Sequence, residues 1–153
     1  ALLTQKTLLE DFLVDKLALI HKATSDEEKH AIIWCVSNLV PLRQFRDARL
    51  HVVFYENLCL HPEAEIPKLF RAIGRPCTDT VFRYAKRPST TTQLQSAVLK
   101  GIDPTATWRS ELSSDAIKRV LDIVREFGLD HLYGDAEMPL QTAANPGEMT
   151  HGC

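Results

Sequence analysis

Cationic and hydroxyl side chains lie together in one short stretch of the chain, residues 86–92. Arg87 offers a planar fork of N–H donors, and the hydroxyls of Ser89 and Thr90 add short neutral donors, which suit the oxygens of a phosphate or sulfate group. Pro88 disrupts a helix, and the run of Ser and Thr that follows is poor material for a packed core. The stretch predicts an anion-binding loop, with an ordinary solvated loop as the alternative.

Lys100 and Gly101 are a second candidate for contact with an anion. The lysine supplies a mobile point charge, and the glycine lets the backbone approach a ligand closely. The pair alone is too short to identify a site. No glycine-rich phosphate loop precedes a helix elsewhere in the sequence.

The 153-residue chain has the composition of an ordinary globular domain, with 44% hydrophobic and 25% charged residues. A formal net charge of −2 argues against a general nucleic-acid binder, because affinity for the phosphate backbone grows with the number of cationic contacts. The sequence has no apolar run long enough to span a bilayer and no signal-peptide pattern at Ala1. Since the chain does not begin with Met, we expect a fragment boundary there.

Cysteine and histidine do not form a pattern typical of a metal site. Cys35, Cys59, Cys77 and Cys153 have no close pairing, and no two histidines stand at helical spacing beside an acidic cluster. The first three cysteines lie in or beside apolar segments, so we expect them to be small buried side chains. No metal is expected.

Residues 49–74 predict a strand, a polar turn and a helix, and the rest of the expected fold is placed around them. The run from Leu50 to Tyr55 has apolar residues at both odd and even positions and is rich in β-branched and aromatic types. This is typical of a central parallel strand covered on both faces. Pro62 suits the first position of the following helix, and Gly74 suits its end.

Apolar residues at helical spacing predict further helices. They are expected over residues 7–20, over 26–45 after a capping box at 25–28, over about 78–85, and up to Phe127 after Ser113 or Ser114 as a cap, with Gly128 as the stop. Trp34 lies in the apolar stripe of the second of these and is expected in the core, with ligand stacking as the alternative. We expect one domain over residues 1–137 and a disordered tail over 138–153.

Several motifs follow one another in the order found in sulfotransferases. They are Tyr-Glu-Asn-Leu at 55–58, Pro-Glu at 62–63, a helix end from Phe70 to Gly74, Arg-Pro-Ser-Thr at 87–90, Trp-Arg at 108–109 and Leu-Tyr-Gly at 132–134. Over roughly residues 26–135 the chain resembles the C-terminal half of a sulfotransferase domain, particularly of the carbohydrate type. Asn57 and His61 stand where that family usually has Asp.

The resemblance implies an α/β fold like that of P-loop NTPases, a parallel sheet with flanking helices, of which this chain would be the helix-rich C-terminal part. It also implies transfer of a sulfuryl group, without a metal, from 3′-phosphoadenosine 5′-phosphosulfate to a hydroxyl or amine acceptor. Carried over from the family, the residues that bind the nucleotide are Arg87, Ser89, Thr90, Lys100 and Gly101. The family's 5′-phosphosulfate loop and its catalytic base have no counterpart here, so we expect no turnover by this chain alone.

Two other functions stay open at this point. The apolar stripes could instead build a non-catalytic helical interaction module, and the implied fold also suits a fragment of a P-loop kinase that uses ATP and magnesium. The acceptor, a small molecule or a carbohydrate, is not specified by the sequence. The cytoplasm and the Golgi lumen are both open as compartments, and a second copy of the chain or a missing N-terminal half is an expected partner.

Overall fold

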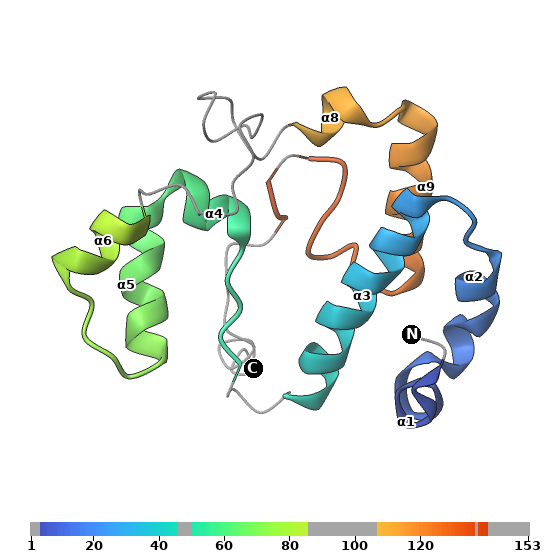
Figure 1. Cartoon of the computed structure of the whole chain (residues 1–153), viewed down its shortest axis with the longest axis horizontal. Coiled ribbons are helices and arrows are strands. Elements are labelled where there is room, and N and C mark those ends of the chain that lie inside the picture. Colours follow the sequence, from blue (N-terminus) through green and yellow to red (C-terminus); the bar gives the residue numbers. More distant parts are fainter. Residues whose placement is uncertain (1–3, 46–49, 86–106, 137, 141–153) are drawn as a thin grey trace, which may run out of the picture.

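The computed structural model describes residues 4–45, 50–85, 107–136 and 138–140 (Figure 1). Its elements are α1 (Lys6–Leu8), the π-helical turn η2 (Leu9–Leu13), the 3₁₀ turn η3 (Val14–Lys16), α2 (Leu17–Lys22), α3 (Asp26–Gln44), α4 (Tyr55–Leu60), α5 (Pro62–Ala72), α6 (Asp79–Ala85), α8 (Trp108–Glu111) and α9 (Ser114–Glu126). None of the helices in these ranges is long and apolar enough to cross a membrane.

The predicted α/β fold with a parallel sheet is wrong, because the described residues contain no strand. Residues 50–54 form a single extended segment that leads from α3 into α4, with Phe54 at φ −89° and ψ 128°. Leu50, Val52 and Val53 have no backbone hydrogen-bond partner among the described residues. The apolar pattern indicates burial on two faces, but a strand also needs a neighbour whose backbone groups pair with its own.

Helix α3 begins as the capping box predicts. The backbone N–H of Glu28 donates to Ser25 Oγ at 3.3 Å, and the backbone N–H of Ser25 donates to Glu28 Oε2 at 3.1 Å. These two bonds satisfy donors that the first turn of a helix leaves open. Pro41 does not end the helix, which continues to Gln44.

The core lies where α3 and α9 pack against each other. Its buried residues are Leu13, Ala31, Ile32, Cys35, Val36, Leu39, Phe54, Ile123, Val124, Phe127, Leu129 and Leu132. Burying each large aliphatic side chain of this set contributes on the order of 2 kcal/mol. An ion pair between Arg119 Nε and Glu28 Oε1, 3.0 Å long, also joins the two helices.

Helix α9 begins and ends at residues that the sequence indicates. Ser113 accepts a hydrogen bond from the backbone N–H of Ala116 at 3.2 Å and is the N-cap. Gly128 adopts φ 71°, and the chain then folds back so that the N–H of Leu129 donates to the carbonyl of Val124 at 3.0 Å. Because Gly128 adopts this left-handed conformation, the chain reverses direction, and Leu129 and Leu132 pack into the core.

The N-terminal segment is helical but is not the single helix predicted over residues 7–20. It is divided into α1, η2, η3 and α2. Leu13, at the junction of the two irregular turns, is fully buried, whereas its neighbour Val14 is 62% exposed. The regular spacing of apolar residues predicted helical backbone but could not indicate these irregular turns, which coincide with the docking of Leu13 into the core.

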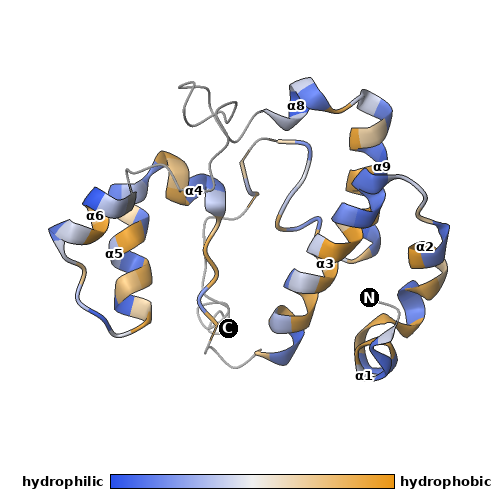
Figure 2. Ribbon diagram, viewed as in Figure 1, coloured by the Kyte–Doolittle hydropathy of each residue, from blue (hydrophilic) through white to orange (hydrophobic). Residues whose placement is uncertain are grey.

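Helices α4, α5 and α6 form a second group, on the other side of the extended segment from α3 and α9 (Figure 1). Pro62 begins α5 and Gly74, at φ 65°, follows its end, as predicted. Residues 50–54, which connect the groups, are coloured mostly hydrophobic in Figure 2. This connection places the first residues of α4 beside the α3 and α9 core.

The cysteines follow the prediction only in part. Cys35 is buried in the core, and burial raises the pKa of its thiol to about 12, so it stays a neutral apolar group. Cys59 is exposed and Cys77 is half-buried, contrary to expectation. Cys153 lies outside the described residues.

Candidate functional site

The residues predicted to bind the nucleotide all lie outside the described residues. They are Arg87, Ser89, Thr90, Lys100 and Gly101. The anion-binding loop therefore stays a prediction from the sequence.

A cavity of about 470 Å³ opens between α3, α8, α9, the start of α4 and the loop that follows α9. We call it the Trp34 cavity. Its aromatic and polar lining comes from Trp34, Tyr55, Glu56, Trp108 and Tyr133, and its aliphatic lining from Ala31, Leu112, Ile117, Val120, Leu121 and Val124, with Gly134 and Ala136 at the edge. This volume lies within the range of pockets that hold small organic ligands.

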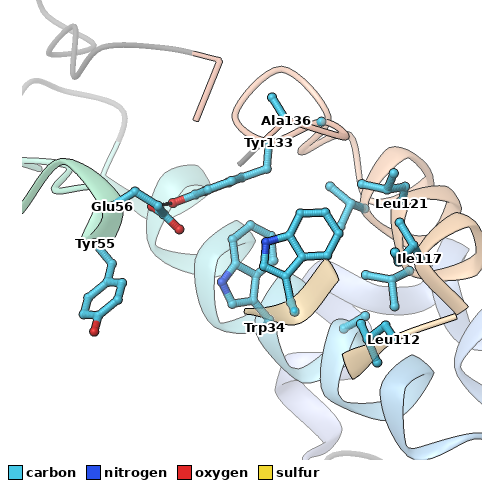
Figure 3. A pocket seen from close by; sticks show the side chains of 13 residues that line it. Trp34, Tyr55, Glu56, Leu112, Ile117, Leu121, Tyr133 and Ala136 are labelled. Atoms are coloured by element: carbon cyan, nitrogen blue, oxygen red, sulfur yellow. Dashed lines mark hydrogen bonds between the residues drawn. The ribbon is translucent and has the colours of Figure 1, made fainter. Parts of the chain in front are cut away.

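The two ends of the Trp34 cavity differ in chemistry. In Figure 3 the carboxylate of Glu56 and the hydroxyl of Tyr133 lie on one side of Trp34, and Leu112, Ile117 and Leu121 lie on the other. The ring of Tyr55 points away from both Trp34 and Tyr133. The cavity thus has an aliphatic end, aromatic walls and one polar end.

Tyr133 is the centre of an aromatic cluster. Its ring centroid lies 5.4 Å from that of Trp34, with the rings at 84°, and 5.7 Å from that of Phe54, with the rings at 66°. Both are edge-to-face arrangements, which aromatic quadrupoles favour by about 1 kcal/mol beyond the area that they bury. Phe54 is buried, so the cluster connects the cavity with the core.

The hydroxyl of Tyr133 donates a hydrogen bond to Glu56 Oε2 at 2.7 Å. Burial, and after it the bond to the Glu56 carboxylate and the carboxylate's charge, raise the pKa of Tyr133 well above its ordinary value. The phenol therefore stays protonated and remains a donor at neutral pH.

Trp108 is held at the cavity by its neighbour in the sequence. The guanidinium carbon of Arg109 lies 4.7 Å from the centroid of the Trp108 ring, a cation–π arrangement. Arg109 also donates to the backbone carbonyl of Asp135. The arginine thereby links α8 to the loop after α9, on either side of the cavity.

A second hollow, of about 310 Å³, runs along the extended segment beside α3. It shares Trp34, Tyr55 and Tyr133 with the Trp34 cavity and is otherwise lined mainly by residues 50–54 and the last turns of α3. Residues 50–54 thus present apolar side chains to a groove rather than to the faces of a sheet.

Sequence reasoning missed the roles of three residues in this site. Trp34 was predicted in the core but is 36% exposed and lines the cavity. Glu56 and Tyr133 were noted only as parts of motifs, with no role. The available signals were that Glu56 directly follows an apolar run and that Tyr133 comes five residues after the predicted helix stop at Gly128, but nothing in the sequence pairs them.

No protein-family model, no curated protein and no solved structure matches this chain. The resemblance to sulfotransferases therefore stays a prediction from the order of short motifs. Among the described residues no group of three His, Cys, Asp or Glu side chains could hold a metal ion.

Proposed function

We propose that this chain is the C-terminal part of a sulfotransferase-type enzyme and contributes to binding the donor 3′-phosphoadenosine 5′-phosphosulfate. The observation that supports the proposal is the convergence of three of the motifs that carry the resemblance. The three motifs are far apart in the sequence, yet residues of each line the Trp34 cavity: Tyr55 and Glu56, Trp108, and Tyr133 with Gly134. Motifs that only capped separate helices would have no reason to meet.

The chemistry of sulfuryl transfer suits the residue types of the predicted anion-binding loop. A sulfuryl group in transfer spreads negative charge over its oxygens, so positioned cations and N–H donors lower the barrier. In this proposal Arg87, Ser89, Thr90, Lys100 and Gly101 hold the nucleotide, notably its 3′-phosphate. We assign no residue as the base, and the proposal is limited to donor binding.

The test is isothermal titration of the chain with adenosine 3′,5′-bisphosphate at low and at moderate salt. We expect saturable binding that weakens with salt, because the contacts are between ions. Arg87→Ala should lower the affinity about tenfold or more, since it removes a charge-assisted pair of hydrogen bonds. The control is Arg75→Ala, which removes an exposed arginine that precedes α6 and should leave the affinity unchanged.

No binding by a chain that circular dichroism shows to be folded would contradict the proposal. Equal loss in Arg87→Ala and Arg75→Ala would remove Arg87 from the site. Tighter binding of ATP with magnesium than of the bisphosphate would instead favour the alternative that the chain is a fragment of a P-loop kinase.

A non-catalytic interaction module is the second candidate, and the helical architecture favours it. The described residues form helices without a sheet, and large apolar side chains such as Ile33 and Ile73 are exposed. Such side chains are available for contact with a partner. This function predicts a stable fold with no affinity for the bisphosphate, so the same titration separates the two candidates.

A further inference from the structure

We infer that the Trp34 cavity binds a hydrophobic cation, a molecule with an aromatic or aliphatic body and an ammonium group at one end. The inference uses none of the residues expected to hold the nucleotide. It concerns binding alone and stands or falls independently of sulfuryl transfer.

The body of such a ligand matches the greater part of the cavity. Leu112, Ile117 and Leu121 supply apolar area at one end, and Trp34 and Trp108 supply aromatic surface beside it. Pockets of this size and lining bind by removing apolar area from water, with a few polar groups fixing the orientation. An indole or a similar ring system satisfies both conditions.

The charge of the ligand is indicated by Glu56. In the described part of the chain the carboxylate of Glu56 has one hydrogen-bond partner, the hydroxyl of Tyr133 at Oε2, and no Lys or Arg there forms an ion pair with it. Arg109, which follows Trp108 in the sequence, lies over the Trp108 ring and donates to the backbone carbonyl of Asp135. A partly buried carboxylate that has no cationic partner among the described residues favours a ligand that brings a positive charge.

The aromatic walls select for the same charge. Trp34 and Tyr133 lie edge to face beside Glu56, and the electron-rich faces of such rings attract an ammonium group. An anionic ligand would meet both the carboxylate and these faces and would be repelled. Cation–π attraction and the carboxylate thus act together at one end of the cavity.

The experiment compares three ligands that share an indole ring and differ in charge: tryptamine, tryptophol and indole acetate. Isothermal titration should show saturable binding, with tryptamine about tenfold tighter than tryptophol and indole acetate weakest. Glu56→Gln should remove most of the advantage of tryptamine and leave tryptophol unchanged. Glu126→Gln, an exposed carboxylate at the end of α9, is the charge-matched control and should change neither affinity.

A second variant covers the case in which Glu56→Gln does not fold. Tyr133→Phe leaves the carboxylate in place and removes its one neutral partner, so the preference for tryptamine should persist or increase. Trp108→Ala should weaken all three ligands by a similar factor, because it removes wall area without changing charge. No binding of tryptamine, equal affinities for tryptamine and tryptophol, or a preference that survives in folded Glu56→Gln would each overturn the inference.

Discussion

Tyr133 and Glu56 lie 77 residues apart in the sequence and are joined by a 2.7 Å hydrogen bond from the phenol to Oε2. This contact attaches the start of α4 to the loop that follows α9. The ring of Tyr133 meanwhile packs edge to face on Trp34 and Phe54, so one side chain joins α3, the extended segment and α4. The polar end of the Trp34 cavity exists because of this junction.

A double-mutant cycle on Tyr133→Phe and Glu56→Ala should reveal this coupling. Each single substitution should destabilise the fold by about 1 kcal/mol, because a hydrogen bond to a charged but partly exposed carboxylate is lost. The double variant should cost less than the sum, by about 1 kcal/mol of coupling. Urea denaturation followed by circular dichroism measures all four species. Strict additivity would show that the bond contributes nothing in solution.

Stability should also fall in alkali because of Tyr133. The pKa of the folded-state phenol is raised above its ordinary value of 10.0, so the protonated form is favoured by folding. Its contribution is fully present below pH 10 and is lost as the pH rises through the folded-state pKa. The free energy of unfolding should therefore decline more steeply above pH 10 in the parent chain than in Tyr133→Phe. Identical alkaline slopes would argue against the buried position of this phenol.

The capping box should produce a dependence on pH in acid. The backbone N–H groups of Thr24 and Ser25, and then Arg119, lower the pKa of Glu28 below its ordinary value of 4.5. A carboxyl group whose pKa is lowered in the folded state contributes stability above its ordinary pKa. That contribution is lost as the pH falls through the folded-state pKa. Glu28→Gln should flatten this acid loss, while Glu126→Gln should keep it. The measurement is thermal unfolding as a function of pH.

Two adjacent residues test the packing of the N-terminal segment. Leu13 is fully buried and Val14 is 62% exposed. Leu13→Ala should cost about 3 kcal/mol, the usual result of opening a cavity in a core, while Val14→Ala should change stability by less than about 0.5 kcal/mol. Chemical denaturation separates these values easily. A small effect of Leu13→Ala would mean that the segment does not dock on the α3 and α9 core.

Hydrogen exchange tests the correction to the fold. The amides of Val52 and Val53 have no partner in the described structure, whereas that of Leu129 donates to the Val124 carbonyl and lies in the core. Exchange at residues 52 and 53 should be faster than at Leu129 by about 100-fold or more. Comparable protection at the two places would indicate that the extended segment is paired with another strand.

The cavity could not be predicted from the sequence, although several of its residues had been noted. Tyr55 and Trp34 have apolar rings and occupy apolar stretches, which is why we predicted both to be buried, yet Tyr55 is 58% exposed and Trp34 lines a cavity. A pattern of hydrophobic residues indicates how much apolar area of a segment must be buried. The pattern does not indicate which other segment buries that area, or whether the burial is complete.

What the sequence determined by itself is where several of the helices begin or end. These boundaries depend on a hydrogen bond or a backbone dihedral within a few residues, so they can be predicted without knowledge of the fold. They are marked by Ser25 with Glu28, Pro62, Gly74, Gly128 and, of two candidate serines, Ser113. Tertiary structure alone decided that residues 50–54 form an extended segment with no strand beside it in the described part of the chain, that Leu13 docks between irregular turns, and that Glu56 meets Tyr133. Those outcomes depend on contacts between distant residues, and such contacts form only where packing brings their partners within reach.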